Sequence, residues 1–292
     1  MFSRSKSSFL LPVVLVFLTA CGGGDQRQLI QNKGSDTLVN VAQAWAEAYQ
    51  QVDPTVMVAV SGGGSGTGIA ALINGTADIA NSSRELKPEE IEQARQAGHD
   101  PVEHIVGYDA LAVYLNPANP VDTLNFAQLA AIYGDGGSAV KWTDLGVEVP
   151  GCSDQTIVVG SRQNNSGTYE YFRETILGKG DFRLGTRDMQ GSKDVVDLIE
   201  NTPCAIGYSG LAYATDRVKM ACIAKQEGDA CITPSEETAK DRSYPIARSL
   251  LMYTGGTASP AVAGYLDWIK SDAGQCIIMK QGYAPVGEPS CG

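Results

Sequence analysis

The stretch SGGGSGTG, Ser61 to Gly68, follows directly on the apolar run TVMVAV and holds five glycines, two serines and a threonine. Glycine loses more conformational freedom on folding than any other residue, so this cluster indicates a place where the backbone must approach a ligand closely. The stretch lacks the lysine of a Walker A loop. It also misses, by one position each, the spacings of the dinucleotide fingerprint and of the serine-hydrolase elbow. We therefore interpret it as an anion cradle between a strand and a helix.

The segments on either side of the cradle continue one rhythm, in which an apolar strand leads into an amphipathic helix. This rhythm is typical of parallel strands covered by helices, and it predicts an α/β fold. The predicted strands are 29–33, 55–60, 77–83, 105–116, 156–162, 205–210 and 244–254, and the predicted helices are 39–51, 67–75, 87–98, 125–134, 167–178, 193–201, 260–270 and 272–281.

The length of the chain predicts two lobes, because about 270 residues after the leader exceed what one hydrophobic core usually carries. The apolar run at 105–116 is long enough to cross from one lobe to the other, and the run at 244–254 returns. We expect lobe 1 at 29–112 plus 246–292, and lobe 2 at 113–245. Open α/β folds bind ligands at the carboxyl ends of their strands, so the cleft between the lobes is the expected binding site.

The N-terminus has the features of an export leader. Arg4 and Lys6 precede an apolar run at 9–18, and LTAC ends at Cys21. These features predict a signal peptide at 1–20. The motif resembles a bacterial lipobox, in which Cys21 would be lipidated and residues 21–28 would form a tether; an ordinary signal peptide with a chance cysteine is the alternative. We expect an extracytoplasmic protein, in the periplasm or at the cell surface, anchored to a bacterial membrane by lipid.

The charge of the chain limits its partners. Removal of residues 1–20 takes away Arg4 and Lys6 and moves the formal net charge from -11 to -13. So acidic a protein is a poor partner for nucleic acid or for anionic membrane surfaces. If it binds an anion, local hydrogen-bond geometry must hold that anion.

The cysteine count predicts disulfides. Six of the seven cysteines remain after Cys21, an even number in an exported chain. We expect the pairs Cys222–Cys231, Cys152–Cys204 and Cys276–Cys291, although the sequence does not fix the connectivity. A four-cysteine metal site is the alternative, and the lack of any C-x-x-C pair argues against it.

Three strand-to-helix junctions share one chemistry: GSDTL at 34–38, the cradle at 62–68 and SRQNNSGT at 161–168. Each offers Ser or Thr at a helix start, where backbone N–H groups lack partners and the helix dipole is positive. Such ends bind oxyanions. A helix N-cap is the alternative for any one of them, yet three glycine-flanked instances favour a shared ligand. Arg162 supports this, because its planar donor fork suits an oxyanion.

The quoted junctions, together with ADIANSSR, AIGYSG and YPIARSLLMYT, resemble the phosphate-binding lipoprotein or periplasmic component of phosphate ABC transporters, from about Leu29 to Val286. The resemblance implies a two-lobed, type II periplasmic-binding-protein-like fold with mixed sheets flanked by helices. Such a protein closes on inorganic phosphate and delivers it to a membrane permease. It has no cofactor, no metal and no catalytic residue, and we expect it to be a monomer.

The resemblance also implies the phosphate-binding residues. Those of the first lobe are the Thr37 hydroxyl, the Leu38 N–H with Ser35 nearby, and Ser65. Those of the second lobe are the Arg162 guanidinium and the hydroxyl and N–H groups of Ser166, Gly167 and Thr168.

Two positions depart from the family pattern. Ser83 stands where familiar members carry an aspartate that accepts the phosphate proton, and we interpret it as a hydroxyl partner, with Arg84 as a second cation. Asn164 stands where the acidic partner of the binding arginine is expected. Asp36 is our first candidate, and Asp109 our second, for the missing proton acceptor.

Three other functions remain open at this point. The same module could bind sulfate, molybdate or tungstate, or it could be a surface lipoprotein that senses phosphate or adheres without a transporter. A secreted phosphatase or other hydrolase is the alternative from a different class. It would need His99 or His104 as a base for Ser65 or Ser166, and neither histidine is near those serines in sequence.

Overall fold

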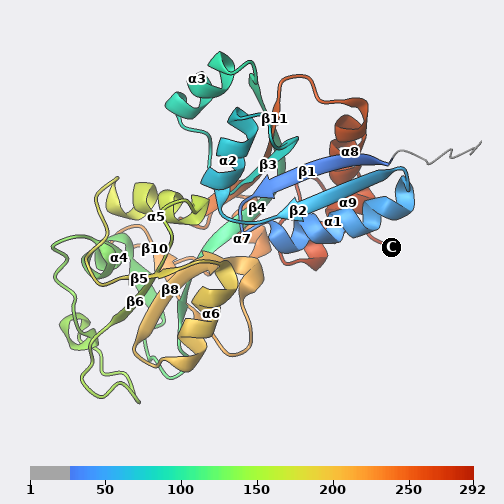
Figure 1. Ribbon diagram of the computed structural model, residues 1–292. Helices are drawn as coiled ribbons and strands as arrows, with labels where there is room; N and C mark the ends of the chain where they lie inside the picture. The colour runs from blue at the N-terminus through green and yellow to red at the C-terminus, as the bar shows by residue number, and fades with distance from the viewer. Residues whose placement is uncertain (1–26) are drawn as a thin grey trace, which may run out of the picture.

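A computed structural model describes residues 27–292, in which helices pack on a nine-stranded mixed sheet (Figure 1). The order of the main strands is β2-β1-β3-β11-β4-β8-β6-β7, with β9 also pairing with β4; β5 and β10 form a separate two-stranded sheet. The strands are β1 (Gln28–Gly34), β2 (Val56–Ser61), β3 (Ile79–Ser82), β4 (Pro101–Leu115), β5 (Thr123–Asn125), β6 (Val158–Arg162), β7 (Arg187–Met189), β8 (Ala205–Gly210), β9 (Lys219–Met220), β10 (Cys222–Ala224) and β11 (Ala247–Gly255).

The longer helices lie close to the ranges that the sequence predicted. They are α1 (Val39–Val52), α2 (Ser65–Ile73), α3 (Pro88–Gln96), α4 (Phe126–Tyr133), α5 (Gly167–Leu177), α6 (Ser192–Asn201), α7 (Glu236–Lys240), α8 (Pro260–Lys270) and α9 (Asp272–Lys280), with 3-10 turns η1 (Trp142–Leu145) and η2 (Leu211–Tyr213). The α/β class and the mixed sheet are therefore confirmed. The sequence patterns missed α7 and the short strands β5, β7, β9 and β10.

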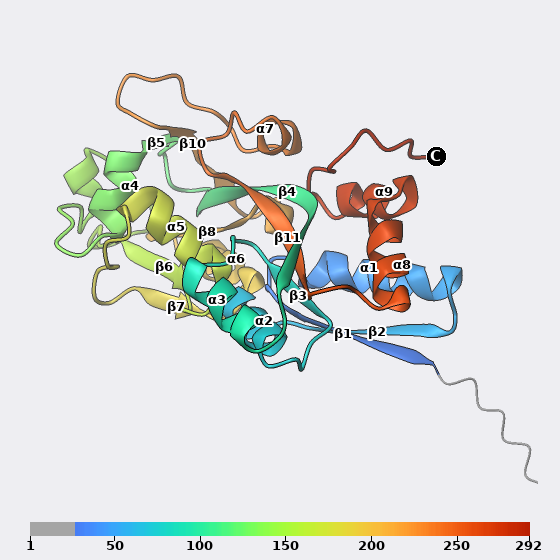
Figure 2. The same ribbon diagram turned by 90° about the horizontal axis from the view of Figure 1, so that it is seen from above.

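Strand β4 joins two parts of the molecule. Its residues up to Ala110 pair antiparallel with β11, and its last five residues pair antiparallel with β8. We name the elements β1, β2, β3, β11, α1, α2, α3, α8 and α9, with β4 up to Ala110, the first half, and the remaining elements the second half. Figures 1 and 2 show the halves on either side of the crossing strands β4 and β11. The long strands predicted at 105–116 and 244–254 are present as β4 and β11.

Each half has its own buried core on both faces of its sheet. In the first half, Ile79 packs with the core beneath α1, α8 and α9, and the next residue, Ala80, packs with α2 on the opposite face. In the second half, Val113 and Tyr114 divide in the same way between two cores. This follows from the strand geometry, because successive side chains point to opposite faces. The segments that follow the carboxyl ends of β1 and β6 meet where Thr37 contacts Thr168.

All three expected disulfides are confirmed: Cys152–Cys204, Cys222–Cys231 and Cys276–Cys291.

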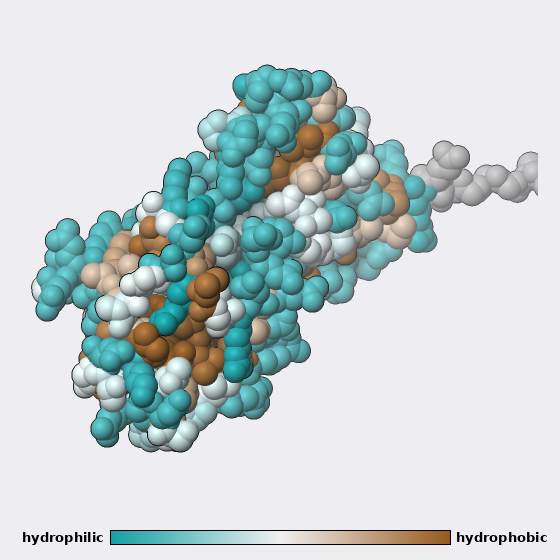
Figure 3. Space-filling model, turned by 60° about the vertical axis from the view of Figure 1, so that its left-hand side comes forward, coloured by the Kyte–Doolittle hydropathy of each residue, from teal (hydrophilic) through white to brown (hydrophobic). Residues whose placement is uncertain are grey.

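Hydrophilic residues cover most of the face in Figure 3, with apolar patches between them. Within residues 27–292, the helices are all too short or too polar for a bilayer crossing. The predicted signal peptide at 1–20, the lipidated Cys21 and most of the tether at 21–28 lie outside the described residues.

Candidate functional site

The glycine cradle lies against the second half of the molecule. Gly63 and Gly64 have φ angles of 109° and 89°, a left-handed region that favours glycine. A Cβ atom on Gly64 would stand 2.6 Å from the carbonyl oxygen of Asn165, and the N–H of Gly66 donates to that same oxygen over 2.9 Å. The glycines therefore admit the peptide of Asn165 from the other half, in addition to starting α2 at Ser65.

Four hydroxyls from both halves meet at this contact. Thr37 Oγ1 lies 3.1 Å from Thr168 Oγ1, and Ser65 Oγ lies 3.4 Å from Ser83 Oγ while accepting the N–H of Ser83 over 3.1 Å. All four side chains are buried. We call Thr37, Ser65, Ser83 and Thr168 the hydroxyl cluster. It gathers three of the predicted first-half residues and one of the second half at one place.

The start of α5 completes the cluster from the second half. The Ser166 hydroxyl caps this helix by accepting the N–H groups of Thr168 and Tyr169. At Gly167 a Cβ atom would collide with Ser65 Oγ and lie 2.8 Å from Ser83 Oγ. The predicted residues Ser166, Gly167 and Thr168 are thus brought against Ser65 and Ser83, and only a glycine permits that approach.

Arg162 is the last residue of β6, in the strand that leads to the α5 junction, and it is 1% exposed. Its Nη1 donates to Ser192 Oγ over 3.1 Å, and its Nη2 lies 3.4 Å from Asp36 Oδ2 and 3.3 Å from the Gln190 carbonyl oxygen. Its Nε is buried with no hydrogen-bond partner among the described residues. Burial lowers the pKa of Arg162, against the opposing effect of Asp36. Asp36 therefore occupies the place of the acidic partner that Asn164 does not provide.

Arg248 also reaches the hydroxyl cluster, and sequence reasoning missed it. Its Nε and Nη2 donate to Asp109 Oδ2 over 2.9 and 2.7 Å, and its Nη1 donates to Thr168 Oγ1 over 3.0 Å. Both members of the pair are almost fully buried. The signal in the sequence was one charged residue in each of the two crossing strands, within otherwise apolar runs.

The remaining predicted residues lie at the edge of this arrangement. Ser35 and Leu38 form the turn before α1: the Ser35 N–H donates to the Asn81 carbonyl, and the Leu38 N–H donates to the Ser35 carbonyl over 3.1 Å. The structure does not join the Arg84 guanidinium to the hydroxyl cluster. Its hydrogen-bond acceptors in the described part of the chain are the Glu90 carboxylate and the Glu85 carbonyl.

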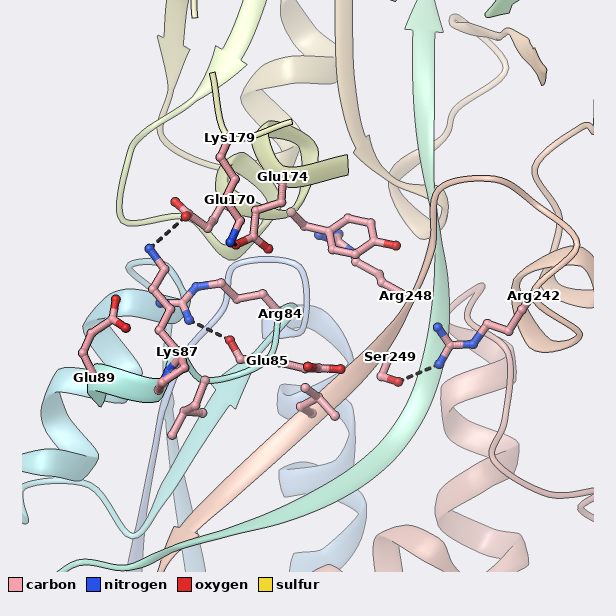
Figure 4. A pocket seen from close by; sticks show the side chains of 14 residues that line it. Arg84, Glu85, Lys87, Glu89, Glu170, Glu174, Lys179, Arg242, Arg248 and Ser249 are labelled. Atoms are coloured by element: carbon pink, nitrogen blue, oxygen red, sulfur yellow. Dashed lines mark hydrogen bonds and ion pairs between the residues drawn. The ribbon is translucent and has the colours of Figure 1, made fainter. Parts of the chain in front are cut away.

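A groove of about 580 Å³ opens beside the cluster, between α3 and α5 (Figure 4). Arg84 and Lys87 line it from the first half, Glu170 lines it from the second, and Arg248 lies at its inner end. Lys87 Nζ and Glu170 Oε1 form an ion pair of 2.8 Å across the groove. Since Arg248 lines the groove and also touches Thr168, the groove leads toward the buried cluster.

Neither histidine joins the cluster. His104 lies within β4, and its Nε2 lies 3.2 Å from Thr254 Oγ1; His99 lies beside Gly75 and Gly255. Over residues 27–292 there is also no group of three or more His, Cys, Asp or Glu side chains that could hold a metal ion. The chemistry that this arrangement offers is hydrogen-bond donation and positive charge directed at one small volume.

Comparison with known proteins agrees with this geometry. A family model described as a PBP superfamily domain matches residues 21–273. The phosphate-binding protein PstS of Pseudomonas aeruginosa is 35% identical over 268 residues, which cover 88% of this chain and 83% of that protein. The chain belongs to this PstS-like family of binding proteins.

Solved structures confirm the fold. A putative phosphate ABC transporter substrate-binding protein from Clostridium perfringens, with bound phosphate, superposes with a TM-score of 0.77 at 28% identity and covers 89% of this chain and 100% of its own. An ABC-type phosphate transport receptor from Vibrio cholerae gives a TM-score of 0.70 at 26% identity, covering 87% and 99%. The expected periplasmic-binding-protein fold and the expected family are therefore both confirmed.

Proposed function

We propose that this chain is the phosphate-binding component of a phosphate ABC transporter, and that it holds inorganic phosphate at the hydroxyl cluster. The observation that carries the proposal is the meeting of buried hydroxyls from both halves with Arg248 at the starts of two helices, while the buried Arg162 lies beside Asp36, the neighbour of Thr37 in the chain. Helix N-termini and planar guanidinium groups both favour tetrahedral oxyanions. The family membership supports the same ligand, because the Pseudomonas aeruginosa relative is a phosphate-binding protein.

The predicted residues divide by role in this proposal. Thr37, Ser65, Ser83 and Thr168 donate hydroxyl protons to phosphate oxygens, and the start of α5 adds Gly167 with the capping residue Ser166. Arg162 supplies a cation, and its unpartnered Nε supports that role, because buried donors in folded proteins are almost always hydrogen-bonded. Ser35 and Leu38 shape the turn that presents Thr37.

Arg84 takes a different place from the one that the sequence predicted. It follows Ser83 in the bend after β3, where the Ser82 hydroxyl donates to the Arg84 carbonyl oxygen over 2.6 Å. Glu90 holds its guanidinium at the rim of the groove through two hydrogen bonds of 2.8 and 2.6 Å. We infer that Arg84 acts at the groove and not as a direct phosphate ligand.

Selectivity for phosphate requires an acceptor for its proton. Asp109 has both oxygens engaged, Oδ1 by the Leu211 N–H and Oδ2 by Arg248, and its side chain is fully buried. Asp36 accepts the Gly63 N–H with Oδ1, but within residues 27–292 its Oδ2 has only the 3.4 Å contact with Arg162. Asp36 is therefore the favoured acceptor, which keeps the order of preference that the sequence suggested.

Calorimetric titration of ligand-stripped protein with phosphate, sulfate and tungstate tests the function. We expect phosphate to bind more tightly than sulfate, since a fully ionised sulfate would place an acceptor against the Asp36 carboxylate. Asp36→Asn should narrow the preference, mainly by improving sulfate binding. Equal binding of all three anions by the wild type, or a preference for tungstate, would assign the site to another oxyanion. If the wild type strongly prefers phosphate and Asp36→Asn leaves that preference unchanged, Asp36 is not the proton acceptor, but the phosphate assignment stands.

We further propose that the halves are mobile lobes, with the boundaries 29–112 plus 246–292 and 113–245, which close on the anion as a monomer. The family is one of transport proteins and not of enzymes, so a chromogenic phosphate ester should not be turned over. A permease encoded beside this protein would support transport over sensing.

An anchor at Cys21 would hold the protein outside the cytoplasm at the membrane. Loss of membrane attachment in a Cys21→Ser variant, with unchanged phosphate binding by the soluble domain, tests that part. A variant that stays in the membrane fraction would show that the lipobox was misread.

A further inference from the structure

The crossing strands β4 and β11 carry one buried ion pair at the point where the halves meet. Arg248 on β11 is directly opposite Asp109 on β4 in the antiparallel register. Side chain exposure is 2% for Arg248 and 0% for Asp109, and Nη2 of the arginine lies 2.7 Å from the carboxylate. Arg248 is the only charged residue of β11, and Asp109 is the only one in the apolar part of β4 from Ile105 to Leu115. Packing alone does not explain this ion pair, because apolar residues of similar volume can often replace a buried ion pair without loss of stability.

The contacts of Arg248 point to the hydroxyl cluster. Its Nη1 donates to Thr168 Oγ1 over 3.0 Å and lies 3.4 Å from the Ser83 carbonyl oxygen, and its Nη2 lies 3.4 Å from Thr37 Oγ1. These three residues come from three separate junctions and from both halves. Arg248 is thus a shared partner of the segments that the proposed function assigns to phosphate.

The direction of these hydrogen bonds matters chemically. Arginine donates and cannot accept, whereas a hydroxyl can do both. A threonine hydroxyl that accepts from Arg248 keeps its own proton free to donate elsewhere. Thr37 and Thr168 can share only one proton in the 3.1 Å contact between their oxygens. With Arg248 in place, the second proton therefore remains available to an acceptor beside the pair, such as an anionic oxygen.

Charge gives the second argument. A buried anion requires compensating donors, and Arg162 and Arg248 each bring a guanidinium that one carboxylate already faces. Asp109 stays behind Arg248, where its Oδ1 also accepts the Leu211 N–H over 3.0 Å. Its carboxylate fixes the guanidinium in place and leaves Nη1 directed at Thr168.

We propose that Arg248 is the second cation of the phosphate site, orienting the Thr37 and Thr168 hydroxyls as donors, with Asp109 as its positioning residue. This inference rests on the proposed function, since it concerns the same ligand. It assigns to a crossing strand the role that sequence reasoning gave to Arg84. Through Asp109 and Arg248, the strands β4 and β11 are also connected directly to the bound anion.

The test compares single and paired substitutions by calorimetry with inorganic phosphate. Arg248→Gln should weaken phosphate binding by about thirtyfold or more, in the range seen when one partner of a buried charge pair is truncated. Arg248→Lys keeps the charge but loses the planar fork, so it should recover part of the affinity. A lysine variant no better than the glutamine variant would contradict the charge contribution. Arg95→Gln removes an exposed arginine that pairs with Asp100 and controls for the change in net charge.

A paired variant separates binding from folding. Arg248→Gln combined with Asp109→Asn replaces the ion pair with two neutral amides, and the asparagine oxygen can still accept the Leu211 N–H. We expect this variant to unfold at nearly the wild-type temperature and to bind phosphate as poorly as Arg248→Gln. If it binds phosphate within threefold of the wild type, the pair only braces the strands and the inference is overturned. A wild type that binds no phosphate would instead overturn the proposed function, and this inference with it.

Discussion

The starts of α2 and α5 face each other across the candidate site, and each presents a serine beside glycine. The Ser65 hydroxyl lies in the first turn of α2, whose N-cap is Gly64, and it accepts the Ser83 N–H from a neighbouring loop. The Ser166 hydroxyl precedes α5 and accepts two N–H groups of its own helix. One hydroxyl therefore serves the site, and the other serves the helix that carries the site.

The difference shows how position relative to a helix start decides what a hydroxyl can do. A serine at the N-cap satisfies orphan N–H groups, whereas a serine one position later points its oxygen away from them. The first half thus provides hydroxyl donors, among them Ser65 within the glycine-rich cradle. The second half provides Arg162 and a capped helix terminus. Each of the following substitutions tests one of these contributions to the site.

The largest expected effect concerns the cation of the second half. Arg162→Ala should cost about 2–5 kcal/mol of phosphate binding, as for truncated buried charge pairs. Part of the loss comes from Asp36, whose partially buried carboxylate would lose its cation. Calorimetric titration of the variant measures it, and circular dichroism verifies that it is folded. Near-normal affinity would show that Arg162 does not bind phosphate, so that the second half would contribute only the start of α5.

A smaller effect is expected for the hydroxyl of the first half. Ser65→Ala should cost about 1.5–3 kcal/mol of binding, the value of one hydrogen bond to a charged group, with little change in thermal stability. Ser166→Ala is the matched comparison, because it deletes the α5 cap and should lower the free energy of unfolding by about 0.5–2 kcal/mol. A Ser65→Ala variant that unfolds early while binding normally would show that the two serines have the same structural role.

Much of this division could be predicted from the sequence, because it follows from local patterns. The alternation of apolar runs predicted the large helices and strands, and the family resemblance based on the junction motifs named Thr37, Ser65, Ser83 and Thr168 as candidates. The three disulfides were also predicted correctly. The missed elements, such as β9 and β10, have two or three residues and depend on pairing with distant strands for their existence.

The sequence marks Arg248 as a lone charge in an apolar run, but its place in the site could not be predicted, for the same physical reason. It meets Asp109, which is 139 positions away, only through the register of two crossing strands. The sequence placed Arg84 in the site because it follows Ser83, although Ser83 contacts Ser65 while Glu90 binds the Arg84 guanidinium. Local motifs therefore identified the site, and tertiary pairing decided which arginine reaches it.

The smallest expected effect tests whether the two helix starts must touch. Gly167→Ala adds one methyl group that would collide with Ser65 Oγ and stand 2.8 Å from Ser83 Oγ. Such overpacking typically costs about 1–3 kcal/mol, and here it opposes the approach of the halves. Alanine is also a better helix former than glycine, by about 1 kcal/mol, so α5 itself should not be weakened. We therefore expect weaker phosphate binding, with faster phosphate release in stopped-flow measurements and an unfolding temperature close to that of the wild type.

The matched control is Gly264→Ala in α8, where the added methyl group meets only the Tyr49 hydroxyl at 3.2 Å and lies away from the hydroxyl cluster. This substitution should leave phosphate affinity unchanged. If Gly167→Ala also binds normally, the two helix starts tolerate greater separation than the contact of Gly167 with Ser65 indicates. The hydroxyls of the first half would then reach the anion without close contact between the helix starts, and the glycine at the start of α5 would have no role in binding. If Gly167→Ala binds weakly and Gly264→Ala does not, the loss belongs to the contact between the halves, because both variants place the same methyl group on a helix.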